Sequence, residues 1–303
     1  MKNLSNPVVF SAFDGISCGR VALERAGINV SLYFASELIV IDGRINPSVL
    51  ITQSNYPDTV QLGDICQIDG KPLRGRVDIF FGGSPCQSFS NAGQRNGFEG
   101  KSKLFYEFVR LLEEINPTYF LLENVVMKKQ WEHIISNILG VDPIHINSSL
   151  VSGQNRPRTY WTNIPYTPIK DHEILLSDVI QGAVTGASKH GARNPNYGVI
   201  PDETKWKSKD WKFNPNNKSR CLVRSTGHYL NIQGEIVKLT PENCEKLQTL
   251  PVGYTKVHGI CNTDRIKALG DAWTVDVLVK AFFKNLPWAL NYKDKPIYFS
   301  EKV

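Results

Sequence analysis

The sequence has no long apolar run and no closely paired cysteines. No stretch is long enough to cross a bilayer, and residues 1–8 lack the apolar core of a secretory signal. No two cysteines have the C-x-x-C spacing of zinc and redox sites; they are Cys18, Cys66, Cys86, Cys221, Cys244 and Cys261. These absences predict an intracellular, cytoplasmic protein with reduced thiols, no targeting signal, no membrane contact and no metal.

The composition excludes little else. The chain has 303 residues, of which 41% are hydrophobic and 21% charged, which is ordinary for a globular protein. That length suits one large domain, or a large domain with a small one. A net charge of +6 is compatible with a polyanionic partner such as nucleic acid, but it does not demonstrate one.

Apolar runs alternate with helical patterns over roughly the first half of the chain. This alternation predicts an α/β fold with a doubly wound, mostly parallel sheet. Strands are expected at 8–13, 32–35, 60–62, 77–81, 118–122 and 159–162, and helices at 20–26, 48–54 and 104–115.

The first two predicted strands end in residues suited to a ribosyl cofactor. Asp14-Gly15-Ile16-Ser17 follows the first strand, and Ser36-Glu37 follows the second. A glycine turn lets the backbone approach a ligand closely, and an acid at the second strand's end can bind ribose hydroxyls. The turn is not a clean G-x-G-x-x-G, so a tight turn without a ligand and an exposed acid remain alternatives.

A single cysteine, Cys86, follows the strand at 77–81. A thiolate at the carboxyl end of a buried strand lies where open α/β sheets bind ligands, and it can act as a nucleophile. A lone cysteine is more often a buried structural residue, but Glu123 and Arg158 also follow or flank buried strands. A thiolate could add to C6 of a pyrimidine while the carboxyl group contacts N3 and the guanidinium contacts O2.

The character of the sequence changes after about residue 165. Residues 181–234 are rich in Gly, Asn, Lys and Ser with little periodicity, which predicts a small, irregular second domain. Lysines and tryptophans interleave between Lys205 and Lys218, a pattern suited to phosphate contacts, although a solvated basic loop explains it about as well. Thr240-Pro241-Glu242 begins a predicted helix, and an apolar helix over 275–286 predicts a return to the first domain.

Several of these motifs, in this order, resemble those of the DNA (cytosine-5)-methyltransferases. The matching stretches are Phe13-Asp14-Gly15-Ile16-Ser17, Ser36-Glu37, Gly63-Asp64-Ile65, Gly83 to Ser90, Glu123-Asn124-Val125, Gln154-Asn155-Arg156-Pro157-Arg158 and Gly270-Asp271-Ala272-Trp273. The resemblance covers almost the whole chain, excepting about residues 165–215. It implies a Rossmann-like catalytic domain over 1–164 plus 265–303 and a target-recognition domain over 165–264. It also implies a monomer of the bacterial or phage type, as found in restriction–modification systems.

The resemblance further implies methyl transfer from S-adenosylmethionine to C5 of a flipped-out cytosine in double-stranded DNA, through a covalent adduct of Cys86 and without a metal. The catalytic residues would be Cys86, Glu123, Arg156 and Arg158. The cofactor would be bound by Phe13, Asp14, Gly15, Ile16, Ser17, Glu37, Leu38, Asp64, Ile65, Gly83, Pro85, Asp271, Ala272 and Trp273. DNA would be bound by Gln87, Ser88, Ser90, Arg95, Lys205, Lys207 and Arg224.

Two departures from the family pattern concern the cofactor. An insertion of about six residues follows Glu37, and Asp271 stands where the family commonly has asparagine. An acid here should oppose a donor with an additional carboxylate, such as carboxy-S-adenosylmethionine, unless a base such as Arg44 compensates. We therefore expect 5-methylcytosine as the product, with a different C5 group as the alternative. A non-catalytic DNA-binding paralogue, an RNA cytosine methyltransferase and a dinucleotide oxidoreductase are rival interpretations; Cys86 and Glu123 argue against the first.

Overall fold

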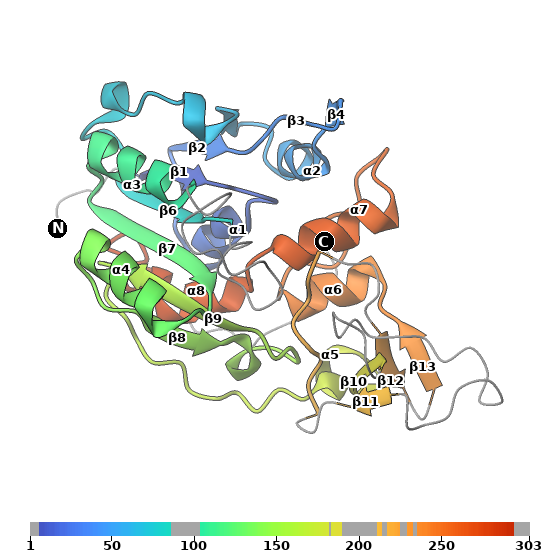
Figure 1. The fold of residues 1–303 in the computed structure, drawn as a ribbon. Coiled ribbons are helices and arrows are strands. Elements are labelled where there is room, and N and C mark those ends of the chain that lie inside the picture. Colours follow the sequence, from blue (N-terminus) through green and yellow to red (C-terminus); the bar gives the residue numbers. More distant parts are fainter. Residues whose placement is uncertain are drawn as a thin grey trace. The chain divides into compact units, whose positions relative to one another are not determined.

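The computed structural model describes residues 6–85, 104–181, 183–189, 211–213, 217–224, 229–232 and 235–293 (Figure 1). The chain forms two compact units. The first comprises Met1–Ile146, Pro157–Pro168 and Val277–Asp294, and the second comprises Asn147–Arg156, Ile169–Asp276 and Lys295–Val303. The second unit thus includes residues 147–156 and 265–276, which the sequence-based boundaries assign to the catalytic domain. The sequence-based boundaries between the catalytic and target-recognition domains stay a prediction.

The first unit contains a seven-stranded sheet in the order β5-β2-β1-β6-β7-β9-β8. These strands are β1 (Val8–Ala12), β2 (Leu32–Ser36), β5 (Val60–Gln61), β6 (Ile79–Gly83), β7 (Tyr119–Val125), β8 (Ile144–Asn147) and β9 (Pro157–Thr162). The pairings from β5 to β7 are parallel, whereas β9 runs antiparallel to β7. The order is close to that of a doubly wound sheet, so the predicted α/β class is confirmed.

Three predicted helices form close to their expected positions, as α1 (Cys18–Arg25), α2 (Pro47–Asn55) and α3 (Leu104–Ile115), and α4 (Lys129–Leu139) follows β7. Phenylalanine rings join the sheet to α3, because Phe80 of β6 lies 4.7 Å from Phe108 and 5.3 Å from Phe10 of β1 between ring centroids. All three rings are fully buried, and each contributes about 2–3 kcal/mol through apolar burial. This core fixes the ends of β1 and β6, where ligand-binding residues are predicted.

The second unit is more regular than the sequence predicts. It contains an antiparallel four-stranded sheet in the order β11-β10-β12-β13. These strands are β10 (Ala183–Lys189), β11 (Trp211–Phe213), β12 (Tyr229–Ile232) and β13 (Glu235–Lys238). The expectation of an irregular fold is therefore wrong for these residues. Three of the four strands have only three or four residues, which is too short for an alternating pattern to be recognised in a polar sequence.

The second unit also contains α5 (Leu176–Val179), α6 (Pro241–Leu247) and α7 (Asn262–Asp271). The predicted start of α6 is confirmed, because the Thr240 hydroxyl accepts a hydrogen bond from the Asn243 N–H at 3.2 Å. The apolar helix predicted over 275–286 ends earlier: α8 spans Val275–Ala281, and a 3-10 turn, Phe283–Asn285, follows. Phe282 interrupts the helix with a φ of −128°.

Within the described part of the chain, no helix combines the length and apolar character needed to cross a membrane. The described residues also contain no cluster of three or more His, Cys, Asp or Glu side chains that could hold a metal ion.

Candidate active site

The loop after β1 adopts the tight conformation that its glycine predicts. Phe13, Gly15 and Ser17 have φ values of 54°, 59° and 57°, in the left-handed region that favours glycine. The Asp14 carboxylate accepts hydrogen bonds from the Tyr33 hydroxyl at 2.8 Å and from the Ser17 hydroxyl. Burial raises the pKa of Asp14, and these hydroxyl groups oppose the rise. The contacts of Asp14 therefore hold the loop in shape.

Glu37, at the end of β2, is held against this loop. The Gly15 N–H donates to Glu37 Oε2 at 2.9 Å, and Asn46 Nδ2 donates to Glu37 Oε1 at 3.1 Å. The glycine turn and the acid that were predicted to bind a ribosyl cofactor are thus in direct contact.

The insertion after Glu37 forms a hairpin of two short strands, β3 (Val40–Ile41) and β4 (Arg44–Ile45). Asp42 and Gly43 turn between them with φ values of 50° and 74°, as a type I′ turn requires. Asn46 closes the hairpin: its N–H donates to the Ile39 carbonyl, and its side chain donates to the Leu38 carbonyl, both at 2.8 Å. The insertion therefore leaves Glu37 at the tip of β2, and Leu38, predicted to bind the cofactor, is 46% exposed.

Replacing Asn46 by alanine is expected to weaken cofactor binding. The side chain caps α2 by accepting from the Ser48 N–H at 3.0 Å, so its loss should destabilise the fold by about 1 kcal/mol. It should also remove one of the hydrogen bonds that orient Glu37 and raise the Kd of S-adenosylmethionine about 5-fold. Denaturant unfolding and titration calorimetry measure the two effects. Asn55→Ala is the control, because Asn55 Nδ2 donates to the Ile51 carbonyl within α2; equal cofactor affinities in the two variants would contradict a role for Glu37.

Further predicted cofactor residues lie beyond the ends of β5 and β6. Asp64 accepts from the Cys66 N–H at 3.0 Å and so caps the 3-10 turn Ile65–Gln67, in which Ile65 is 4% exposed. Gly83 ends β6 in register with Glu123 of β7. Ile16 is buried at the start of α1, and Pro85 follows β6. The carboxyl ends of parallel strands meet at one edge of a sheet, where such folds bind ligands.

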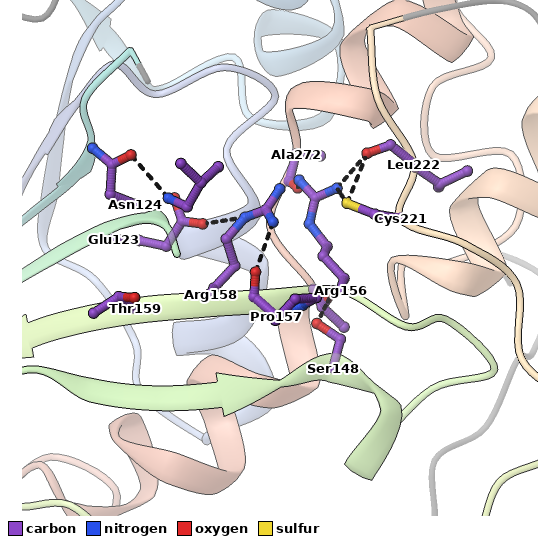
Figure 2. A network of polar contacts seen from close by, with 12 residues as sticks. Glu123, Asn124, Ser148, Arg156, Pro157, Arg158, Thr159, Cys221, Leu222 and Ala272 are labelled. Atoms are coloured by element: carbon purple, nitrogen blue, oxygen red, sulfur yellow. Dashed lines mark hydrogen bonds and ion pairs between the residues drawn. The ribbon is translucent and has the colours of Figure 1, made fainter. Parts of the chain in front are cut away.

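Glu123 and Arg158 form a nearly buried ion pair (Figure 2). Val125 of β7 lies opposite Arg158 of β9, so Glu123, at the next position on the same face, is a diagonal neighbour of Arg158. Arg158 Nε lies 2.8 Å from Glu123 Oε1, and the side chains are 13% and 10% exposed, respectively. The pair presents a carboxylate and a guanidinium side by side, as the predicted pyrimidine site requires.

Asn124, to which sequence reasoning gave no role, links β7 to the segment that leads to the predicted nucleophile. Its Nδ2 donates to the Ser84 hydroxyl at 3.0 Å and to the Ser84 carbonyl at 3.3 Å. Its place next to Glu123 in a matched motif was the available signal. Cys86 and six predicted DNA contacts lie outside the described residues; these contacts are Gln87, Ser88, Ser90, Arg95, Lys205 and Lys207.

Residues 8–139 match the family model for C-5 cytosine-specific DNA methylase. These residues belong to this family. It is 34% identical over 191 residues to the orphan methyltransferase M.SPRI of Bacillus phage SPR, covering 57% of this chain and 42% of that protein. It is 40% identical over 126 residues to the type II methyltransferase M.Eco47II of Escherichia coli, covering 40% of this chain and 28% of that protein. The chain thus spans less than half the length of these relatives.

Solved structures support the same fold. A mutant DNMT2 of Spodoptera frugiperda superposes with a TM-score of 0.64 at 16% identity, covering 90% of this chain and 97% of that chain. A prophage-encoded putative DNA modification methyltransferase from E. coli gives a TM-score of 0.59 with the same identity and the same coverage of both chains. The predicted family and fold are confirmed.

The two arginines of the Gln154–Arg158 motif have different surroundings. Arg156 is 3% exposed, and its guanidinium donates to main-chain carbonyls of the second unit. Arg158 belongs to the first unit and pairs with Glu123. These contacts of Arg156 hold main-chain segments in place. Its predicted catalytic role stays a prediction.

Asp271 has a basic partner that the sequence did not identify. Arg224 Nη1 lies 3.0 Å from Asp271 Oδ2, and the two side chains are 60% and 53% exposed. Desolvation raises the pKa of Asp271, and the guanidinium groups of Arg224 and Arg156 oppose that rise. Arg44, the base suggested from the sequence, lies in the hairpin of the first unit. The predicted DNA contact Arg224 and the predicted cofactor contact Asp271 are thus joined, and Ala272 and Trp273 directly follow Asp271 in sequence.

The contacts of Lys218 differ from those expected of a lysine in a basic, phosphate-binding pattern. Its ammonium group donates to the carbonyls of Ser149 at 2.9 Å and Ser152 at 3.1 Å, and to that of Ile174. Burial lowers the pKa of this lysine. Lys218 therefore joins segments of the second unit, a use of lysine that its position among polar residues did not reveal.

Proposed function

We propose that the chain transfers a methyl group from S-adenosylmethionine to C5 of cytosine in DNA. The observation that carries this proposal is the nearly buried Glu123–Arg158 pair, because Glu123 lies on β7, the strand next to β6, after which Cys86 follows in sequence. Its relatives in a Bacillus phage and in E. coli are named methyltransferases.

Each of the three side chains has a task in this reaction. The Cys86 thiolate adds to C6, and the electron pair of the C5–C6 double bond makes C5 a nucleophile. Glu123 holds N3 and the exocyclic amino group, and Arg158 donates to O2, so that both stabilise the charge that the ring takes up. After methylation of C5, loss of the C5 proton and departure of Cys86 as a thiolate restore the aromatic ring. A base in a duplex must first leave the stack to reach these groups.

The residues of the first unit fit a nucleoside cofactor. A Cβ atom built on Gly15 would meet no atom within 4 Å, so space for a ligand lies beside the turn. Glu37 presents an oriented carboxylate to that turn, as ribose hydroxyls require. S-adenosylmethionine, when bound, supplies an electrophilic methyl group on a sulfonium. Phe13, Glu37, Asp64 and Ile65 would hold its nucleoside part.

The Arg224–Asp271 pair supports a second candidate donor. We expected Asp271 to oppose a donor with an additional carboxylate unless a base compensated, and Arg224 is such a base at 3.0 Å. Carboxy-S-adenosylmethionine is therefore the alternative to test against ordinary S-adenosylmethionine.

The test is mass spectrometry of nucleosides from unmethylated duplex DNA treated with the purified chain and each donor in turn. We expect 5-methylcytosine with S-adenosylmethionine and a far smaller yield of carboxymethylcytosine with the carboxylated donor. The reverse ratio would identify the alternative donor as the substrate. No modified cytosine with either donor, from chain shown to be folded, would contradict the proposed function.

A further inference from the structure

We propose that Arg156 is a positioning residue that holds residues 221–224 in place as a segment that reads DNA sequence. The proposal rests on the proposed function, because it takes DNA as the substrate. It assigns to Arg156 a task that differs from the binding of cytosine by Arg158.

The Arg156 guanidinium joins two segments of the second unit that are far apart in sequence (Figure 2). Nη1 donates to the Leu222 carbonyl at 2.7 Å, and Nη2 donates to the Ala272 carbonyl at 2.7 Å and the Gly270 carbonyl at 3.1 Å. Because the side chain is buried, loss of this fork would leave several carbonyls without these donors. The planar guanidinium reaches these carbonyls through two nitrogens at once, a geometry that the single ammonium nitrogen of lysine does not reproduce.

Two fully buried glutamines complete the same network. Gln154 Oε1 accepts from the Leu222 N–H at 2.8 Å, and Gln248 Nε2 donates to the carbonyls of Leu269 at 2.8 Å and Ala272 at 3.0 Å. Leu222 is thus held at both its N–H and its carbonyl, and Arg156 and Gln248 share the Ala272 carbonyl. Such a satisfied buried network specifies one arrangement of the segments that it joins.

Gly270 fixes how closely the segments pack. A Cβ atom at this position would lie 2.3 Å from the carbonyl carbon and oxygen of Val223 and 2.6 Å from the Arg224 nitrogen. The end of α7 therefore packs directly on the backbone of residues 223–224, with no room for a side chain.

The segment 221–224 has a buried anchor and an exposed face. Leu222 is 1% exposed, whereas Val223 is 37% exposed and the Arg224 side chain is 60% exposed. Arginine and apolar side chains are those that recognise guanine and the thymine methyl group in the major groove. We infer that Arg224 and Val223 contact base edges, and that Arg156, through the Leu222 carbonyl, determines where they lie.

The test measures methylation of the preferred duplex site and of sites with one base pair changed, using the full chain. In Arg156→Lys the charge remains, but the planar fork that donates to Leu222 through one nitrogen and to Ala272 through another is lost. We expect discrimination between the sites to fall about tenfold, through KM for DNA. A uniform fall in kcat with discrimination intact would overturn the proposal and make Arg156 catalytic.

Arg265→Lys is the matched control. Arg265 is also buried in the second unit, but it bonds to Glu242 at 2.7 Å and Glu245 at 3.1 Å. The Arg265→Lys variant should lower thermal stability as Arg156→Lys does and leave discrimination between DNA sites unchanged. An equal loss of discrimination in both variants would show that Arg156 is merely structural. If Arg156→Lys does not fold, the exposed variant Arg224→Gln decides: wild-type discrimination in that variant would overturn the proposal. Absence of methylation by the wild-type chain would instead contradict the proposed function.

Discussion

Cys86→Ala is expected to abolish methyl transfer and to leave DNA binding intact. Without a thiolate at this position no adduct forms at C6, so C5 never becomes nucleophilic, and the rate should fall by at least about 10⁴-fold. DNA affinity should persist because phosphate contacts, which supply most of it, come from other residues. Methyl incorporation by mass spectrometry and DNA binding by fluorescence anisotropy measure the two properties.

Cys244→Ala is the control for this experiment. Cys244 is fully buried, and burial together with the Glu245 carboxylate raises the pKa of its thiol well above the usual range, so it is not a nucleophile at neutral pH. This variant should lose some stability and keep its methylation rate at permissive temperature. Substantial turnover by Cys86→Ala would show that another group attacks the base.

Glu123→Gln is expected to lower kcat by about 10²–10⁴-fold while the protein stays folded. The glutamine oxygen can still accept from Arg158 Nε, but the side chain no longer carries the charge or the proton of a carboxyl group. Glu123→Ala should additionally lower the free energy of unfolding by about 3 kcal/mol, because it removes the carboxylate that pairs with the 13% exposed Arg158. Single-turnover kinetics and urea unfolding separate the two effects.

Glu107→Gln supplies the matched comparison. Glu107 pairs with Arg110 on α3 at 2.9 Å, but both side chains are about one-third exposed, so the pair should matter little for stability and not at all for the reaction. A wild-type rate in Glu123→Gln would remove Glu123 from the proposed mechanism.

The sequence was informative where local pattern determines structure. The apolar face of residues 104–115 predicted α3 at its observed bounds, and the glycine turn and the acid follow β1 and β2 as predicted. The contact between Glu123 and Arg158 could not be derived in this way. It depends on β9 running antiparallel beside β7 and on their register, which are long-range properties of the sheet.

Arg156 and Arg158 show the same limit within one motif. They are identical side chains two positions apart, yet one is enclosed by carbonyls at Leu222 and Ala272 while the other pairs with a carboxylate. Segments distant in sequence decide between these surroundings. The partner of Asp271 was missed for the same reason, since Arg224 comes next to it only through packing at Gly270.

The hairpin after Glu37 has a consequence for how this chain can be altered. Asn46 ties the two ends of residues 40–45 together, so the conformational entropy of closing that loop depends only weakly on how many residues it contains. Loops of other lengths, a fluorescent tag or an affinity peptide could replace residues 40–45 without displacing Glu37. The exposed positions Val40 and Ile45 are 59% and 53% accessible, so such a graft would remove apolar surface from the protein.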